Sequence, residues 1–507
     1  MLPNSTARQP NPTTGIGADS RLLSGFGRLN YNFDEKYLIT ATMRADGSSK
    51  FAIGQRVGYF PAASVAWRLS KEEFMKSLTS VSDLKLRVSY GLSGNNRIGD
   101  FLFSQFFQAG GGQYGFNKSI VLGTIATSLP NSRLKWETTV SRNLGVDLSL
   151  FDNRVQVTAD VYKNTTRDLL VDVPITPTSG YTTQLQNIGE TSNRGFELQV
   201  SGTVMQTKDF TWTASANMSV NRGRIESLGP IQSILSNSGW ASTSLSSDFI
   251  ARVGDPVGLM YGYVTDGFYT ADNFKSYNAT TRAWVLQDGV ASDATVQGQP
   301  VAPGIIKFKD LNGDGVVNSL DQMVIGNANP KATGGFNQQF TYKGFDASIF
   351  LNFVLGNDVY NANKLEYTSA VNPYSNMLAT MNGRYRTIDD NGAPITDLNV
   401  SRQLNQNATI WQPTRQPLFH SWGVESGSFL RLNNITVGYS LPKALIAKIK
   451  LTQARVYVTA NNIYTFTGYS GYDPEVNTRR SSPLTPGVDY GGYPRSRLML
   501  VGVNLSL

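Results

Sequence analysis

Hydrophobic and polar positions alternate with period two along much of the chain, most clearly on both sides of residues 151–153. After this turn, apolar side chains alternate with polar ones: Val155, Val157, Ala159 and Val161 against Gln156, Thr158, Asp160 and Tyr162. A period of two places the two sets on opposite faces of a strand. Residues 135–150 are a long strand before the turn, and the Asp-Asn turn is short enough for a tight hairpin. The stretch predicts a hairpin with one apolar and one polar face.

The same two-faced pattern recurs and predicts an all-β chain. Thirteen strands are expected, at about residues 22–33, 37–45, 58–69, 84–92, 135–150, 155–165, 196–201, 211–220, 334–342, 345–355, 429–441, 454–466 and 501–507. In the strand at 211–220, one face is expected to carry Trp212, Ala214, Ala216, Met218 and Val220. The apolar face of the strand at 429–441 changes phase near Asn433 and Asn434, which predicts a β-bulge.

The segments between the strands contain turn and loop residues. Loops are expected at 46–56, 94–132, 166–192 and 442–453, and long insertions at about 223–333 and 356–428. Residues 70–80 indicate a short helical turn, with Ser70 as N-cap and Glu73 three residues later.

The lengths of these connections predict a transmembrane antiparallel β-barrel. Short and long connections alternate, as expected where periplasmic turns are short and extracellular loops are long. A soluble sandwich has no reason to sort its loops by length, and its strands are shorter. An odd number of strands cannot close such a barrel, so the barrel is expected to be incomplete and to need further strands upstream. Residues 1–21 are then the remainder of an extracellular loop, and residues 22–507 the C-terminal part of the barrel.

Composition agrees with this prediction and excludes several other classes. The 507 residues are 40% hydrophobic and 16% charged, with 48 Gly, 21 Pro and no Cys. No run approaches the ~18 apolar residues of a membrane helix, but alternation hides the membrane signal of a barrel. The net charge of +8 comes from scattered Lys and Arg residues. Without a clustered basic stripe and aromatic platforms, nucleic-acid binding is not expected.

Eight segments resemble the SusC/RagA-like family of TonB-dependent outer-membrane transporters. They are FGRLNYNFDEKYLITATMRADGSSKF (26–51), GYFPAASVAWRLS (58–70), LKLRVSYGLSGN (84–95), LKWETTVSRNLGVDLSLFDNRVQVTADVYKNTTRDLL (134–170), NRGFELQVSG (193–202), GDPVGLMYGYVTDGFY (254–269), GSFLRLNNITVGYSLP (427–442) and ARVYVTANNIYTFTGYSGYDPEV (454–476). Their order covers nearly the whole chain from Gly25 to Leu507.

The resemblance implies a barrel of about 22 strands around a plug, in the outer membrane of a Gram-negative cell envelope. It also implies energy from TonB and a SusD-like lipoprotein lid that captures glycans or peptides. The plug, the TonB box and about nine strands are absent from this chain by that count. The chain ends in Leu507, where an aromatic residue is usual in the family.

One loop has the spacing of a calcium site. The oxygen-bearing positions of the pattern fall on Asp310, Asn312, Asp314, Val316 (through its carbonyl), Asn318 and Asp321. Gly315 occupies the sixth position, where the turn requires glycine. Position 12 is Asp, whose shorter side chain reaches less easily for bidentate contact. The flanking residues indicate strands, so a helix-loop-helix sensor is not expected, and a polar turn without metal is the alternative.

Aromatic residues in the long insertions are candidates for contact with a substrate or a lid. These are Trp240, Tyr261, Tyr263, Trp284, Trp411 and Trp422. Their rings could stack on sugar rings or grip the lid; the alternative is packing inside the loops. Tyr37, Trp67 and Tyr464, near strand ends, fit an interfacial girdle instead.

Catalytic constellations are not expected, and no organic cofactor is implied. His420 is the only histidine, which excludes His-based triads and multi-histidine zinc sites. Gly110–Gly112 lacks the Lys and the strand-to-helix context of a phosphate loop. Two further functions stay open from the sequence: a passive outer-membrane porin, and a secreted β-rich glycan-binding protein.

Overall fold

The computed structural model describes residues 20–105, 107–116, 119–126, 128–240, 247–370, 374–414, 418–447, 451–478 and 482–507. Most of the predicted loop 1–21 therefore lies outside the described residues. Within the described ranges, no helix has the length and apolar character that crossing a membrane would need.

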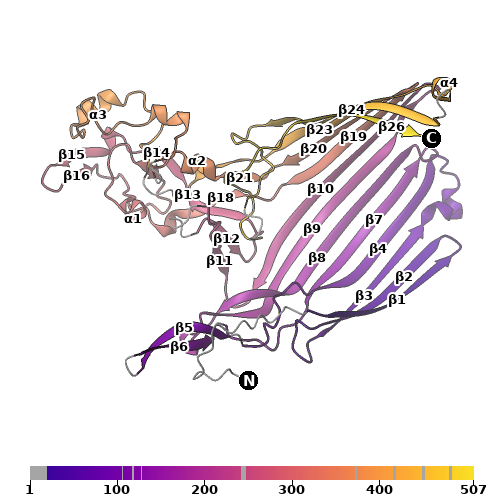
Figure 1. Ribbon diagram of the computed structural model, residues 1–507, viewed down its shortest axis with the longest axis horizontal. Helices are drawn as coiled ribbons and strands as arrows, with labels where there is room; N and C mark the ends of the chain where they lie inside the picture. Colours follow the sequence, from indigo (N-terminus) through magenta and orange to yellow (C-terminus); the bar gives the residue numbers. More distant parts are fainter. Residues whose placement is uncertain are drawn as a thin grey trace. The chain divides into compact units, whose positions relative to one another are not determined.

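A large antiparallel sheet contains thirteen strands of the described chain, which confirms the predicted number (Figure 1). Their bounds are β1 Leu22–Phe33, β2 Tyr37–Ser48, β3 Val57–Arg68, β4 Val81–Asn95, β7 Glu137–Leu150, β8 Val155–Pro174, β9 Thr183–Gln206, β10 Phe210–Leu228, β19 Ala332–Tyr342, β20 Phe345–Leu355, β23 Phe429–Ser440, β24 Gln453–Thr467 and β26 Leu498–Ser506. The strands follow this order in the sheet, with β1 and β26 at its two edges. The sheet in the described chain is therefore not closed.

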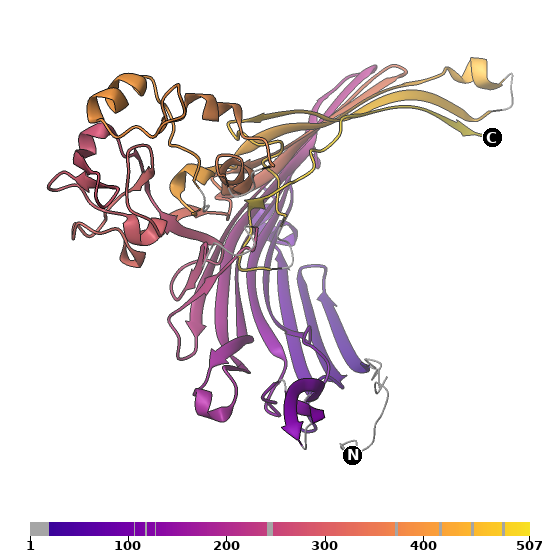
Figure 2. The same cartoon turned by 60° about the vertical axis from the view of Figure 1, so that its left-hand side comes forward.

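Contacts divide the chain into two compact units. The first contains residues 1–202 and 222–232, and the second contains 203–221 and 233–507. In the first unit β1 to β4, β7 and β8 lie side by side in both views (Figures 1 and 2).

The tight turns explain why the chain reverses where it does. Asp34 and Glu35 between β1 and β2 have φ of 54° and 51°, and Lys343 between β19 and β20 has φ of 53°. Phe151, Asp152 and Asn153 between β7 and β8 all have positive φ as well. Asp and Asn tolerate this left-handed region better than most residues, which is why the Asp-Asn signal located the hairpin correctly.

Register in the first unit produces two chemically different faces. One row of directly paired residues is apolar: Trp67, Leu86, Val146, Ala159 and Leu198. On the opposite face Arg87 lies between Asp147 and Asp160, with its guanidinium 2.9 and 3.1 Å from their carboxylates. The alternation read from the sequence is thus an apolar face and a polar face of one sheet.

The second unit repeats this division. One paired row contains Phe340, Ala347, Val437, Val458 and Val501. The next row, on the other face, contains Gln339, Ser348, Thr436 and Thr459. The predicted bulge is confirmed, because Phe350 pairs with Asn434 and Leu351 with Leu432, leaving Asn433 as the extra residue.

Two predicted loops contain strands and were wrong in part. In the predicted loop 166–192, β8 continues to Pro174 and β9 begins at Thr183. Its Thr, Pro and Asn residues indicated turns, but the two strands pair through them with register shifts near Leu169. In the predicted loop 94–132, β5 (Phe107–Phe116) and β6 (Ser119–Ala126) form a hairpin that includes Gly110–Gly112. The glycine-rich sequence of this segment indicated a loop, so the hairpin was not predicted.

The helical turn at 70–80 forms, but its predicted cap does not. Two short 3-10 helices occur there, η1 Leu69–Lys71 and η2 Glu73–Met75. The Ser70 hydroxyl donates to Asp83 at 2.5 Å instead of capping a helix, and Glu72 precedes η2.

The connections alternate between two sets that differ in length, but with overlap. One set is 34–36, 69–80, 151–154, 207–209, 343–344 and 441–452; the other is 49–56, 96–136, 175–182, 229–331, 356–428 and 468–497. The connections 49–56 and 175–182 are shorter than 69–80 and 441–452. The strict alternation of short and long was therefore overstated, although all the long insertions are in the second set.

The two long insertions have secondary structure of their own. In the first, β11 (Ser233–Ser236), β12 (Phe249–Arg252), β13 (Leu259–Tyr263) and β18 (Gln322–Asn327) form a sheet, β14 (Thr265–Phe268) pairs with β17 (Ile306–Phe308), and β15 (Phe274–Asn278) pairs with β16 (Ala283–Leu286). A fourth small sheet joins β22 (Val424–Ser426) and β21 (Asp358–Asn361) of the second insertion to β25 (Val488–Asp489) of the connection 468–497. The short helices are α1 Ala294–Gln297, α2 Ala362–Glu366, α3 Leu398–Leu404, α4 Lys443–Ile446, η3 Pro177–Ser179, η4 Ala271–Asn273, η5 Ser319–Asp321, η6 Ala379–Gly383 and η7 Ser421–Gly423.

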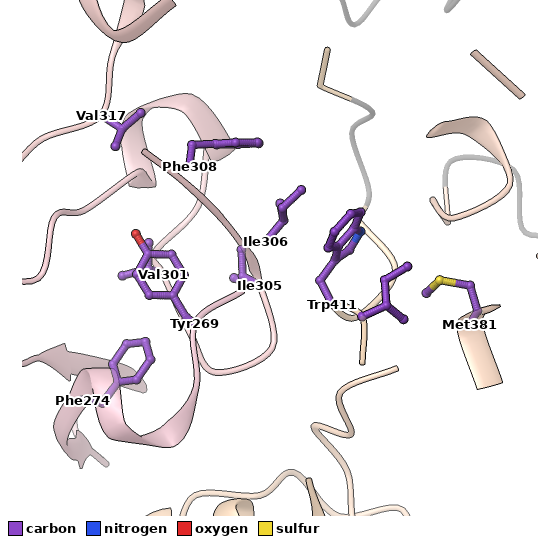
Figure 3. Packing of buried hydrophobic residues seen from close by; sticks show 10 residues of the cluster. Tyr269, Phe274, Val301, Ile305, Ile306, Phe308, Val317, Met381 and Trp411 are labelled. Carbon is purple, nitrogen blue, oxygen red and sulfur yellow. The ribbon is translucent and has the colours of Figure 1, made fainter. Parts of the chain in front are cut away.

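The insertions share a hydrophobic core that joins distant parts of the sequence (Figure 3). Tyr269, Phe274 and Phe308 from the first insertion are buried in it together with Met381 and Trp411 from the second. This core belongs entirely to the second unit.

Candidate functional site

The predicted calcium loop connects β17 to β18 and is closed by its own hydrogen bonds. Gly313 and Gly315 donate backbone N–H groups to the Asp310 carboxylate at 2.7 and 2.9 Å. These hydrogen bonds, the one from Gly315 most strongly, hold the pKa of the Asp310 carboxyl below its usual range. Asp321 is fully buried and accepts from the N–H groups of Leu311 and Asn318, both at 2.8 Å.

The remaining candidate ligands also contact one another. The Asn312 amide donates to Asp314 at 3.0 Å, and the Val316 carbonyl accepts from Asn318 at 3.2 Å. The donor set is made of oxygens, as a hard divalent cation requires. Among the described residues, however, no three His, Cys, Asp or Glu side chains gather around a common point. The loop therefore has the right chemistry, and a cation would require the Asn312 and Asp314 side chains to turn inward.

A buried carboxyl lies behind this loop. The backbone of Ser292 bonds to Gly315 and Val317 at 3.0 and 2.9 Å, which places Asp293 in the core next to the loop. Oδ2 of Asp293 accepts from the N–H of Phe308 at 3.3 Å, while its Oδ1 has no hydrogen-bond partner among the described residues. Burial raises the pKa of Asp293 to about 6. No sequence pattern points to this residue, because its burial depends on contacts with distant segments.

Two of the six candidate aromatic contacts are buried. Trp411 is 5% exposed in the shared core, and Trp240 is 3% exposed in a second cluster with Tyr360, to which its indole N–H donates. Their rings pack inside the insertions, as the alternative interpretation proposed, and have almost no free surface for a substrate or a lid.

The other four candidates are half-buried, and Tyr263, Trp284 and Trp422 lie at the edges of the same clusters. The ring centre of Trp284 lies 5.1 Å from that of Tyr277, and the ring centre of Tyr263 lies 5.3 Å from that of Phe308. Tyr261 of β13 pairs with Val324 of β18. Lys364 lies 4.2 Å above the ring of Trp422. Each keeps part of its ring exposed, so contact through these four stays a prediction.

The single histidine is part of the core. His420 is 5% exposed between Phe308, Trp411 and Trp422, and burial lowers its pKa to about 3. Its Nδ1 shares a hydrogen bond of 2.7 Å with Thr265. His420 is therefore a neutral packing residue at physiological pH.

Sequence reasoning missed a buried arginine network on the polar face of the second unit. Arg431 of β23 is 1% exposed and contacts Asp473 at 2.5 Å and Glu475 at 3.3 Å. Arg495 pairs with the same two carboxylates at 3.4 and 3.1 Å. These ion pairs fix the connection 468–497 against the sheet, and Asp473, Glu475 and Arg495 also line a hollow of about 650 Å³.

Comparison with known proteins finds a family model and several relatives that match most of this chain. A family model described as TonB dependent receptor-like, beta-barrel matches residues 2–463. The TonB-dependent receptor P3 of Formosa agariphila is 33% identical over 96% of this chain and 46% of its own length. The TonB-dependent receptor SusC of Bacteroides thetaiotaomicron is 30% identical over 97% of this chain and 44% of its own length.

Solved structures agree. The RagAB peptide importer in its closed-closed state matches with a TM-score of 0.72 and 26% identity, over 96% of this chain and 47% of the matched chain. The chain thus spans about half the length of the relatives that it matches.

Proposed function

The chain belongs to the TonB-dependent receptor-like β-barrel family, and we propose that it forms the barrel wall of an outer-membrane active transporter. The SusC/RagA-like character predicted from the eight sequence segments is confirmed by the relatives. The proposed transporter imports oligosaccharides or peptides, with energy from TonB and with a SusD-like lipoprotein as lid. The similarity to the RagAB peptide importer supports peptides as one of the two substrate classes.

One observation supports the membrane assignment most directly. In each unit, register gives the strands an apolar face and a polar face; the apolar rows include Leu86, Val146 and Ala159 in the first unit and Val437, Val458 and Val501 in the second. A barrel wall needs this division, with the apolar face toward lipid and the polar face toward the lumen. The insertions 229–331 and 356–428 are then extracellular and offer the surface on which a lid would dock.

The test is uptake by cells that carry the full-length gene. We expect labelled oligopeptides or oligosaccharides to accumulate, and accumulation to stop when TonB is deleted or the proton gradient is dissipated. Uptake that persists without TonB would indicate the passive porin instead. A full-length protein found in the culture medium and not in the outer membrane would indicate the secreted glycan-binding protein.

We propose also that the loop from Asp310 to Asp321 binds calcium as a structural ion. The spacing of its oxygen donors and the lowered pKa of Asp310 support this, since that carboxyl stays anionic. Asn312 and Asp314 are exposed, and turning their side chains inward would complete the donor set.

A further inference from the structure

Three cations form a row on the apolar face of the first unit. Arg142 of β7 pairs directly with Lys163 of β8, and Lys163 pairs directly with Arg194 of β9. Directly paired residues on antiparallel strands lie on the same face, and neighbouring strands are about 4.8 Å apart. The three charges therefore lie side by side across about 10 Å of the sheet.

This basic row lies at one end of an apolar band. From the turn at 151–154 to the row, paired positions on this face carry only apolar side chains or glycine: Leu150, Val155 and Gly202; Leu148, Val157 and Val200; Val146, Ala159 and Leu198; Leu144, Val161 and Phe196. The stretch from Leu150 to Arg142 spans roughly 25 Å along the strand, which at a tilt of about 40° covers roughly 20 Å of the lipid-facing band of about 25 Å. The row thus marks the edge of the band that is farther from the short turn.

The row has no carboxylate to balance it. All three side chains are exposed, and Lys163 and Arg194 have no hydrogen-bond or ion-pair partner among the described residues. The Arg142 guanidinium lies 5.8 Å from the ring centre of Tyr90. On the polar face, by contrast, Lys85 contacts Asp147 at 2.8 Å.

Like charges directly opposite each other destabilise a sheet, so a bound anion would offset the repulsion. The second unit has no such row. From Tyr342 and Phe345 to Gly334 and Phe353, its apolar face carries no charged residue in the described strands β19, β20, β23, β24 and β26. The basic row is therefore a local feature and not a general property of the band edge.

A hollow next to the row has the character of an acyl-chain groove. It measures about 560 Å³ and is lined mainly by small or apolar residues of β1 to β4, including Gly27, Ala41, Pro61, Ala63 and Tyr90. A side chain added at Gly27 would meet nothing within 4 Å. Tyr90 lines this hollow and also contacts Arg142, so it connects the apolar hollow to the basic row.

We propose that Arg142, Lys163 and Arg194 bind the phosphate groups of a lipid in the outer leaflet, with an acyl chain in the adjacent hollow. The proposal rests on the proposed function, because the membrane orientation places this edge of the band at the outer surface. Arginine and lysine both bind phosphate, and their long side chains extend along the apolar surface to the headgroup level. The bound lipid would supply the missing counter-charges.

The test compares the full-length protein with the variant Arg142→Gln/Lys163→Gln/Arg194→Gln. The matched control is Lys76→Gln/Lys208→Gln/Lys443→Gln, which removes three exposed cations from the connections 69–80, 207–209 and 441–452. Each protein, purified in detergent, is titrated with diphosphoryl lipid A, its dephosphorylated form and inorganic phosphate, and binding is read by native mass spectrometry.

We expect the wild type and the control to bind diphosphoryl lipid A equally, and the basic-row variant to bind it about 100-fold more weakly, since each cation contributes roughly fivefold. Dephosphorylated lipid A should bind all three proteins alike, and equimolar inorganic phosphate should not displace the lipid. Equal affinity in the wild type and the basic-row variant would overturn the proposal, as would displacement by inorganic phosphate.

Membrane insertion is measured separately, from the retention of the wild type in carbonate-washed outer membranes. Absence from that fraction would overturn the proposed transporter and the lipid site together. Retention there with unchanged lipid binding by the variant would overturn the lipid site alone.

Discussion

Asp293 is a buried carboxyl whose surroundings oppose ionisation. Burial raises its pKa from the ordinary value of 3.8 to about 6, and one of its oxygens has no partner among the described residues. A carboxyl whose pKa is higher in the folded protein than in the unfolded chain stabilises the folded state fully only when the pH is below its pKa in the unfolded chain. That contribution is lost as pH rises through the folded pKa, here between about pH 4 and 6.

The first insertion should therefore be less stable at pH 7 than at pH 4 by about 2–3 kcal/mol on account of this group. Asp293→Asn should remove that part of the pH dependence, because an amide does not ionise. Hydrogen exchange of residues 259–327 in the full-length protein, corrected for the intrinsic rate, measures the effect. The control Asp288→Asn changes an exposed carboxyl and should keep the wild-type slope. An Asp293→Asn protein with the same slope would contradict the assignment.

The calcium proposal is tested at Asp314. Three formally negative side chains, Asp310, Asp314 and Asp321, repel one another without a cation, so binding should make the loop more rigid. With Asp at position 12, the dissociation constant should lie in the weak extracellular range of about 10⁻⁴ to 10⁻³ M. Calorimetry should show calcium binding to the wild type and to Asp288→Ala, but not to Asp314→Ala, while barrel assembly is unchanged in all three. Absence of calcium heat in the wild type up to millimolar concentrations would leave only a polar turn.

Single side chains were harder to predict than the strands that carry them. The spacing from Asp310 to Asp321 is visible in the sequence, but the burial of Asp321 is not. Trp411 was a candidate for contact, yet it lies in a core shared with Tyr269 and Phe308, far away in the sequence. Exposure of such residues depends on packing between two insertions, which local periodicity does not report.

Strands were predictable wherever one face is apolar. β1 has the predicted bounds, and β7 and β24 differ from theirs by one or two residues, because alternation of apolar and polar positions indicates both the period and the register. β8 and β9 continue past the apolar band to Pro174 and from Thr183. Outside the lipid-facing band, neither face of these strands has to be apolar. The alternation of apolar and polar residues therefore ends there, while the backbone pairing of the two strands continues.

β10 tests which face meets lipid. Ala216 pairs with Phe336 in the apolar rows, and Ser215 pairs with Asn337 in the polar rows. Ala216→Arg should destabilise the full-length barrel by about 2–4 kcal/mol if it lies near the midplane of the bilayer, and Ser215→Arg should cost far less. Urea unfolding in lipid vesicles measures both. Equal costs at the two positions would mean that β10 does not separate lipid from lumen.

The topology depends on the alternation of the connections between the two ends of the sheet, and the overlap in their lengths does not change it. Antiparallel strands in sequence order require every second connection to lie at the same end of the sheet. The connections 229–331 and 356–428 therefore share one end, and 207–209 and 343–344 share the other. Outer-membrane barrels place the long connections outside the cell. The strand order therefore requires the two long insertions to lie at the same end of the sheet, whatever the lengths of the other connections.

An epitope tag should be accessible on intact cells at one end only. Ser236 in the first insertion is unsuitable for the tag, because it lies in β11 and pairs with Phe249. Thr280, exposed in the turn between β15 and β16, accepts an insertion without breaking a paired strand. A tag there should be labelled by antibody on intact cells expressing the full-length protein, whereas a tag between Lys343 and Gly344 should be labelled only after permeabilisation. Labelling of the second tag alone would invert the topology, and labelling of both would mean that the sheet does not separate two compartments.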